Sequence, residues 1–362
     1  MDNGGADTLK ISVVIATYGR AETIRTTLGC LSDQTLAPDG YEVIVIDDES
    51  PDHTREVVAD WRARAKFRLR YIHHKNRGPG YTQNRGIEVA TAPLVLLIAD
   101  DIFMQRGALE AHVRTHAAHA VEEVAVLGRV EQDDVPDQGL FLRKWDAFRF
   151  RAFRAHEELP YYRFWACNIS AKRRFLLRHG CFREHKGRAG YAAHEDAELG
   201  FRLSKAGLRI VYCPDALGLH HHVVTFEEAC TRRYMQGLNF GEFHAFADAP
   251  EISVAYHVLN WKTLPGHIRA LFGPRRRYLM PADRNPAVLL LRHLARAIVF
   301  NGLAVRTIWQ PLLRRAEHDP SLARLVRPGM YRGVIFSYFL RGCHDGDRRY
   351  PAQPRASVKS PG

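Results

Sequence analysis

The chain of 362 residues lacks the features that define several large classes of protein. Its six cysteines are scattered and form no C-x-x-C pair, which argues against a zinc knuckle or a disulfide framework and fits a reducing compartment. The opening residues MDNGGADTLK do not resemble a signal peptide, and no window reaches about 18 uninterrupted apolar residues. We therefore expect a soluble, cytoplasmic protein.

Glycine-rich phosphate cradles are also missing. The stretch GPGYTQNRG (78–86) lacks the G-x-G-x-x-G spacing, and no G-x-x-x-x-G-K-[ST] motif occurs. Without such a cradle, a binding site lined by carboxylates needs a bridging cation to bind a diphosphate. Mg²⁺ and Mn²⁺ suit this task because they bind protein carboxylates together with substrate phosphates.

Positive charge is in excess, with a net charge of +12. The basic residues concentrate at 143–188 and after 268. Anionic lipid headgroups, a phosphorylated substrate, nucleic acid and a plain solvated surface all remain open as explanations. Nucleic acid is disfavoured, because the basic residues are not interleaved with aromatic residues on a recognisable module.

Strand and helix patterns alternate through the first hundred residues. Apolar runs predict strands over 11–18, 41–50, 68–74 and 93–101, and apolar spacing predicts helices over 22–31, 52–61 and 81–90. This alternation is typical of βαβ units, so we expect an α/β fold with a mostly parallel sheet flanked by helices. Residues 226–345 read as mainly helical and 346–362 as a disordered tail.

Polar side chains follow three of the four predicted strands: Thr17 and Tyr18, Asp47 and Asp48, and Asp100 and Asp101. The last pair ends the apolar stretch LVLLIADDIF (94–103), where burial of unpaired carboxylates is costly. The pair is either a helix N-cap or part of a cation site. Because parallel sheets bind ligands at the carboxyl ends of their strands, all six side chains should meet in one crevice.

An ordered series of motifs resembles glycosyltransferase family 2, the inverting nucleotide-sugar transferases of the Rossmann-like GT-A fold. The motifs are SVVIATYGRAETIRTTL, VIVIDDES, NRGPGYTQNRGI, LLIADDI, FWACNISAKRRFLLRHGCF and HEDAELGFRLSKAGLRIVY, spread from about residue 10 to about 240. The resemblance implies a GT-A catalytic domain over 10–225, followed by the helical extension. Ala16, Gly19, Glu49 and Ala99 depart from the family pattern, and Ala99 occupies the first position of its metal-binding D-x-D.

The resemblance also implies a donor site with a divalent cation. It carries a metal role onto Asp101, a sugar or ribose role onto Asp100 and base recognition onto Asp48. The expected donor-binding residues are Thr17, Tyr18, Arg20, Asp48, Arg77, Arg85 and Asp100. Alternatives are a helix N-cap for Asp48, plain packing for Tyr18, and ion pairs with the acidic cluster for Arg77 and Arg85.

Two further carboxylates and a histidine extend the predicted site. Inverting sugar transfer needs a base for the acceptor hydroxyl, and the resemblance assigns this role to Asp196, with Glu195 binding the acceptor. Acids in a first helical turn are also stabilising on their own. His220 is the second predicted ligand of Mn²⁺ or Mg²⁺, and it would share a strand face with His222. The alternative is a polar strand end before a capping box at Thr225.

Trp165 and Asn168 are candidates for acceptor binding, because an aromatic ring beside an amide suits a sugar-binding wall. Both are equally compatible with a buried core.

Together these features predict a metal-dependent inverting glycosyltransferase that moves a sugar from a nucleotide-diphosphate sugar to a carbohydrate or lipid-linked acceptor. The alternative is a non-catalytic nucleotide-sugar-binding or scaffolding protein, for which Ala99 is the hint. A processive synthase is less favoured, since no Gln-x-x-Arg-Trp motif follows residue 196. The basic C-terminal third adds the hypothesis of peripheral contact with an anionic membrane surface at its inner, cytoplasmic face.

Overall fold

The computed structural model describes residues 9–135, 138–145, 150–184, 193–247, 256, 264–273 and 285–350. The chain forms two compact units. The first consists of Met1–Gln138, Asp146–Lys186 and Glu195–Val223, and the second of Gly139–Trp145, Gly187–His194 and Val224–Gly362. The second unit thus includes Gly139–Trp145, which the sequence division at 225 assigns to the first domain.

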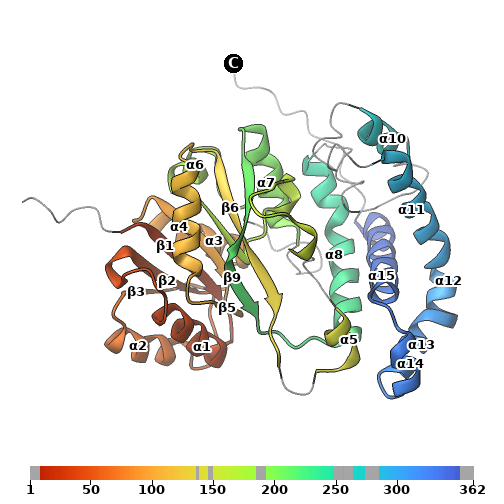
Figure 1. Cartoon of the computed structure of the whole chain (residues 1–362), viewed down its shortest axis with the longest axis horizontal. Helices are drawn as coiled ribbons and strands as arrows, with labels where there is room; N and C mark the ends of the chain where they lie inside the picture. Colours follow the sequence, from red (N-terminus) through yellow and green to blue (C-terminus); the bar gives the residue numbers. More distant parts are fainter. Residues whose placement is uncertain are drawn as a thin grey trace, which may run out of the picture. The chain divides into compact units, whose positions relative to one another are not determined.

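The first unit is built on a nine-stranded sheet in the described part of the chain (Figure 1). Its strands are β1 (Ile11–Thr17), β2 (Tyr41–Asp47), β3 (Arg68–His73), β4 (Leu94–Ala99), β5 (Ile102–Met104), β6 (Val124–Gln132), β7 (Glu158–Leu159), β8 (Asn168–Lys172) and β9 (Arg209–His220). The order is β3-β2-β1-β4-β8-β6-β9-β5, with β7 beside β9. The first four strands are parallel, β8 runs antiparallel to β4 and β6, and β6 is parallel to β9. The predicted α/β class and mostly parallel sheet are confirmed.

The described residues of this unit form six α-helices: α1 (Ala21–Ser32), α2 (Thr54–Arg64), α3 (Pro79–Val89), α4 (Ala108–Ala118), α6 (Arg173–His179) and α7 (Glu195–Lys205). The three predicted helices are confirmed, with ends shifted by up to three residues. Helix α3 lies so close to β1 that a Cβ at Gly86 would be 2.1 Å from Cγ1 of Val14. This close approach fixes α3, and the loop that enters it, beside the carboxyl ends of β1 and β2.

Glu49, which departs from the family's usual glycine, lies in the loop after β2 with φ of 71°. This left-handed conformation strains a residue with a side chain, which explains why glycine is the usual choice there. The Glu49 carboxylate accepts a hydrogen bond of 3.0 Å from the backbone N–H of Asn76. The contact ties this loop to the segment between β3 and α3.

The second unit is helical, as predicted. Its described helices are α5 (Leu140–Lys144), α8 (Phe226–Ala247), α10 (Leu264–Phe272), α11 (Pro286–Val299), α12 (Gly302–Ala304), α13 (Gln310–Ala316), α14 (Pro320–Leu325) and α15 (Pro328–Arg349), with a π-helical turn at Val305–Trp309 (Figure 1). Helices α8 and α15 pack so tightly that a Cβ at Gly342 would be 2.1 Å from the Tyr234 carbonyl oxygen. The predicted tail over 346–362 needs correction, since α15 continues to Arg349; residues 351–362 lie outside the described residues.

The start of α8 confirms the capping box. Oε2 of Glu228 accepts a hydrogen bond of 2.8 Å from the backbone N–H of Thr225, and Oγ1 of Thr225 accepts one of 3.2 Å from the N–H of Glu228. These reciprocal bonds satisfy two backbone donors that a helix start leaves without partners.

Candidate functional site

The carboxyl ends of β1, β2 and β4 bring polar side chains to one edge of the sheet. The parallel register pairs Thr17 with Asp47 and Ala16 with Ala99, so the residues that follow β2 and β4 lie level with the end of β1. Oγ1 of Thr17 donates a hydrogen bond of 2.9 Å to Oδ2 of Asp100. Two of the six side chains that the strand pattern brings to this edge, Thr17 and Asp100, are therefore in direct contact.

Arg20, in the turn between β1 and α1, bridges the two adjacent aspartates. Its Nη1 lies 2.8 Å from Oδ1 of Asp100 and 2.7 Å from Oδ2 of Asp101. Both aspartates are 7% exposed, and the guanidinium supplies the opposite charge that their burial demands. The helix-cap alternative for this pair is wrong, because the next helix, α4, begins only at Ala108 with Gly107 at its N-cap.

The same surroundings separate the pKa values of the two aspartates. Burial, with the nearby charge of Asp101, raises the pKa of Asp100 to about 6, against the opposing effects of Arg20 and Thr17. Burial alone would also raise the pKa of Asp101, but His220 and Arg20 outweigh it and hold that pKa well below its usual range. Asp101 is therefore ionised at neutral pH.

Two histidines from the end of β9 face Asp101. The Nε2 atom of His220 lies 3.7 Å from Oδ2 of Asp101, and Nδ1 of His222 lies 3.5 Å from the same oxygen. The rings of His220 and His222 stack with their centroids 5.4 Å apart. His221 points away and reaches Oδ2 of Asp133 at 2.8 Å, as strand alternation predicts. His222 was not among the predicted ligands, although the alternation that singles out His220 applies to it equally.

One carboxylate and two imidazoles are a suitable donor set for Mn²⁺. In the described part of the chain, however, no group of three or more His, Cys, Asp or Glu side chains is arranged ready to hold a metal ion. Arg20 instead holds the Asp101 carboxylate. The chemistry of the donors fits a divalent cation, while in the present arrangement the Asp101 carboxylate is paired with the Arg20 guanidinium.

Asp48 organises the loop that leads from β3 to α3. Its carboxylate accepts backbone hydrogen bonds of 2.8 Å from Arg77 and 3.0 Å from Gly78, and Nδ1 of His74 lies 3.4 Å from it. The helix-cap alternative for Asp48 is wrong, because the N–H of Thr54 at the start of α2 bonds to Asp52. Base recognition by Asp48 stays a prediction.

The predicted arginines differ in position. The guanidinium of Arg77 lies over the Tyr81 ring, 3.8 Å from its centroid, and Nη2 lies 3.3 Å from Glu184. Arg85 pairs with Glu88, one turn further along α3 and exposed, rather than with the strand-end acids. The ion pair with the acidic cluster that was the alternative for Arg85 is thus replaced by one with Glu88, and its phosphate-binding role stays a prediction. Arg20 contacts the acidic cluster. Tyr18 is 54% exposed, which rules out plain packing.

Asp196 lies in the first turn of α7, close to the same sheet edge. Its Oδ2 accepts a hydrogen bond of 3.0 Å from the backbone N–H of Ala166, and the next residue, Cys167, accepts one of 3.3 Å from the N–H of Ala99. Burial, together with the charge of Glu195, raises the pKa of Asp196 to about 7, although the Ala166 bond opposes this. A carboxylate in this state can accept a proton near neutral pH.

Asn168 is a core residue, which corrects its predicted role in acceptor binding. Its side chain is fully buried, and Nδ2 donates hydrogen bonds of 3.1 Å to the Arg129 carbonyl and 2.8 Å to the Ala216 carbonyl. Oδ1 lies 3.0 Å from Nε2 of His112. These bonds connect β8 to β6, β9 and α4. Both the nitrogen and the oxygen of the amide therefore have partners inside the core.

Trp165 is partly buried against the sheet core, edge-on to Phe150 with centroids 5.5 Å apart, and the Arg163 guanidinium lies 4.8 Å from its ring centroid. Its packing onto the core agrees with the alternative considered for it. The acceptor roles of Trp165 and Glu195 stay predictions.

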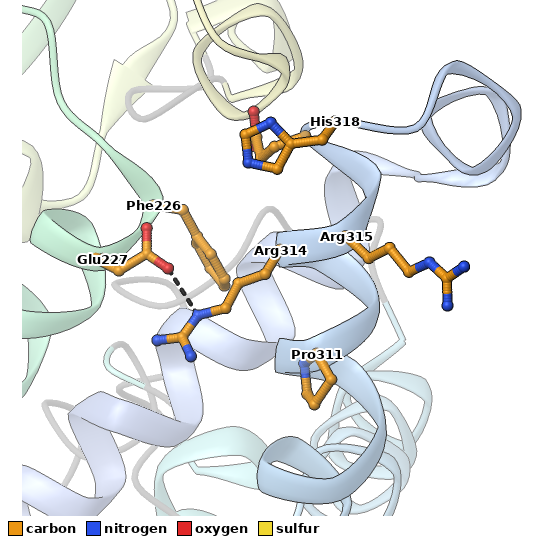
Figure 2. A pocket seen from close by; sticks show the side chains of 7 residues that line it. Phe226, Glu227, Pro311, Arg314, Arg315 and His318 are labelled. Carbon is orange, nitrogen blue, oxygen red and sulfur yellow. Dashed lines mark hydrogen bonds and ion pairs between the residues drawn. The ribbon is translucent and has the colours of Figure 1, made fainter.

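A pocket of about 500 Å³ lies in the second unit, lined by Phe226, Glu227, Pro311, Arg314, Arg315, Glu317 and His318 (Figure 2). Nε of Arg314 lies 2.8 Å from Oε1 of Glu227, so its charge is compensated, and Arg315 points away from that pair. The pocket contains none of the predicted site residues.

Comparisons with known proteins agree on the family. Residues 12–182 match the family model described as glycosyl transferase family 2. Validoxylamine A glucosyltransferase of Streptomyces hygroscopicus subsp. limoneus is 30% identical over 236 residues, 58% of this chain and 51% of that protein. The amylovoran biosynthesis glycosyltransferase AmsB of Erwinia amylovora is 27% identical over 232 residues, 60% of this chain and 71% of that protein. The chain thus spans about half the length of the validoxylamine relative.

Among solved structures, the mannosyltransferase PcManGT from Pyrobaculum calidifontis, in complex with GDP-Man and Mn²⁺, is similar with a TM-score of 0.57 and 18% identity. The alignment covers 96% of this chain and 90% of that chain. The fold is GT-A. Residues 12–182 of this chain, just under half of its length, are similar to glycosyl transferase family 2.

Proposed function

We propose that the protein is a metal-dependent, inverting glycosyltransferase that uses a nucleotide-diphosphate sugar. The observation that carries this proposal is the contrast between two carboxylates near one edge of the sheet. Asp101 is held ionised beside two imidazoles, whereas the pKa of Asp196 is raised to about 7. Paired groups whose pKa values are pushed apart in this way suit a charge-binding role and a proton-transfer role.

In the proposed reaction, the acceptor hydroxyl attacks the anomeric carbon of the donor in a single displacement. Asp196 takes the hydroxyl proton, the new C–O bond forms, and the bond from the anomeric carbon to the diphosphate oxygen breaks with inversion. Asp101, His220 and His222 would hold the cation, which neutralises charge on the leaving diphosphate. Arg20 would supply further positive charge, and Tyr18 and Asp48 would bind the nucleotide base.

One of the relatives is named for amylovoran biosynthesis, and we include a role in polysaccharide, glycolipid or glycoconjugate synthesis in the proposal. The donor's sugar and base and the acceptor are left open. We propose a cytoplasmic location for the enzyme. A non-catalytic sugar-nucleotide binder is the rival.

Slow hydrolysis of the donor, with water as acceptor, tests inversion without knowledge of the acceptor. Proton NMR of the released sugar should first show the anomer opposite to that of the donor, and chelation of divalent cations should stop its release. Release of the retained anomer would overturn the single-displacement mechanism. Absence of turnover with every common nucleotide sugar, despite tight binding of one of them, would favour the non-catalytic rival.

A further inference from the structure

Exposed apolar side chains cluster on consecutive helical segments of the second unit. Seven large ones, between 40% and 72% exposed, make up what we call the apolar face: Val288, Leu291, Leu294, Ile298, Val299, Leu303 and Ile308. Five of the seven lie on α11 and the other two on the segment from Gly302 to Trp309. Exposed apolar residues gathered in this way mark an interaction surface rather than ordinary surface scatter.

The geometry of α11 makes this face continuous. At 3.6 residues per turn, Leu294, Ile298, Leu291, Val288 and Val299 fall within an arc of about 140°. His293, on the opposite side of the helix, is 6% exposed. Helix α11 therefore turns one side to the protein and an apolar side to solvent.

The positive charge of this region favours an anionic partner. From Asn285 to Ala316 the sequence contains five arginines (292, 296, 306, 314 and 315) and no aspartate or glutamate. Arg292 is exposed and directly borders the apolar arc, and Arg306 is exposed in the next segment. Arginine stems can lie along an apolar surface while their guanidinium groups reach anionic headgroups. Two copies of this face would instead bring like charges together, which disfavours self-association.

We propose that α11 and the segment to Trp309 lie in the headgroup region of an anionic lipid bilayer, with the apolar face directed toward the acyl chains. Among the described residues, no single helix is long and apolar enough to cross a membrane. The length and apolar composition needed for a membrane span are reached only by two helical segments taken together, Pro286–Val299 and Gly302–Ala316, which are bent by 50° relative to each other. An amphipathic helix with arginines at its polar border suits a position in the plane of the bilayer.

Sedimentation of the full chain with phosphatidylcholine vesicles, with and without phosphatidylglycerol, tests the proposal. We expect binding to the anionic vesicles at low salt, weakened by added salt. The double variant Leu291→Glu/Ile298→Glu should lower the partition coefficient by at least about tenfold, because both apolar side chains leave the acyl boundary. Val121→Glu, at a position 52% exposed in the first unit, is the matched control and should bind like the wild type.

A second double variant, Arg292→Gln/Arg306→Gln, separates charge from apolar burial. It should weaken binding to anionic vesicles by about fivefold for each arginine and change binding to neutral vesicles little. Thermal melting followed by circular dichroism should show that all variants remain folded. The proposal is overturned if the wild type binds no anionic vesicles or if Leu291→Glu/Ile298→Glu binds normally. Sedimentation equilibrium that shows a wild-type dimer, lost in this variant, would assign the face to a second copy of the chain.

Discussion

Among single residues, Asp196 stands out from the neighbouring acids by its environment. Asp100 and Asp101 share the Arg20 guanidinium, whereas the Asp196 carboxylate accepts a hydrogen bond from the backbone N–H of Ala166. Burial without a cation raises the pKa of Asp196 to about 7, because it disfavours the charged form. A base with this pKa is partly ionised at neutral pH and still accepts a proton effectively.

Asp196→Asn should abolish the proton acceptor while preserving the shape of the side chain. We expect kcat to fall by about 10²–10⁴-fold, with donor binding unchanged, as is typical for loss of a general base. In the wild type, kcat should rise with pH up to about 7 and then level off, because Asp196 must be ionised to act. Steady-state kinetics across pH, with donor affinity from calorimetry, measure both effects. A variant with wild-type kcat would remove Asp196 from the mechanism.

The same substitution, which should lower kcat, should raise the stability of the folded protein at high pH. The pKa of Asp196 is raised on folding from 3.8 to about 7, so its contribution to stability is fully present below pH 3.8 and is lost as pH rises through 7. Asparagine does not ionise, so the Asp196→Asn variant does not lose this stability as the pH rises. We therefore expect the difference in melting temperature, variant minus wild type, to be larger at pH 8 than at pH 5. A pH-independent difference would contradict the raised pKa.

Arg20→Met tests whether the guanidinium competes with a cation for the strand-end acids. Loss of its charge should tighten Mn²⁺ binding in the absence of nucleotide by about tenfold, because Asp100 and Asp101 are no longer neutralised. The substitution should also weaken the binding of nucleoside diphosphates, because the Arg20 guanidinium would pair with the diphosphate. Electron paramagnetic resonance of Mn²⁺ and calorimetry provide the two measurements, and Arg20→Lys is the control that keeps the charge. Weaker Mn²⁺ binding in Arg20→Met would contradict the competition.

The sequence predicts Asp100, Asp101 and Arg20 as site residues but does not predict their contacts. A strand that ends in acids predicts where they lie, because backbone register fixes that position. The partner of a long flexible arginine depends on tertiary packing, so neither the Arg20 bridge nor the pairing of Arg85 with Glu88 could be predicted from spacing.

At the scale of elements, the end of β9 decides which histidines face Asp101. Alternation along the strand directs His220 and His222 to one side and His221 to the other. His220→Ala and His222→Ala should each weaken Mn²⁺ binding by about tenfold or more, since each removes one imidazole donor. His221→Ala is the matched control and should leave the affinity unchanged. Equal effects of all three substitutions would exclude the face-specific role.

Strand β8 supplies the clearest difference between pattern and structure. Asn168 follows an aromatic residue as a sugar-binding amide would, yet it ties β6, β8 and β9 together inside the core. A sequence pattern does not distinguish the two, because a buried amide is recognised only by the carbonyls that surround it.

Asn168→Ala should therefore act on folding rather than on acceptor use. It removes the donor that two buried carbonyls share, and we expect the free energy of unfolding to fall by about 2–3 kcal/mol. KM for the acceptor should not change. Urea unfolding measures the first effect, and a selective rise in KM with full stability would restore the acceptor role.

At the scale of the whole molecule, the alternation of strands and helices was sufficient to predict the α/β sheet unit and the helical extension. The proposed nucleotide-sugar site rests on residues that lie far apart in the chain, such as Thr17, Asp100 and Asp196. The parallel register places Thr17 and Asp100, whereas the position of Asp196 depends on the packing of α7 beside the Ala166 backbone. The choice of cation depends on donors of which one, Asp101, is paired with Arg20.

Thermal melting with UDP, GDP, dTDP or CDP, each with and without Mn²⁺, tests the central claim most directly. A ligand that binds only the folded state raises the melting temperature, by an amount set by its concentration relative to Kd. We expect one nucleotide to stabilise the wild type strongly, only with Mn²⁺, and Asp101→Asn to abolish the effect. If no nucleotide with Mn²⁺ shifts the melting temperature of the wild type, or if Asp101→Asn responds like the wild type, the strand-end acids are not a metal–nucleotide site.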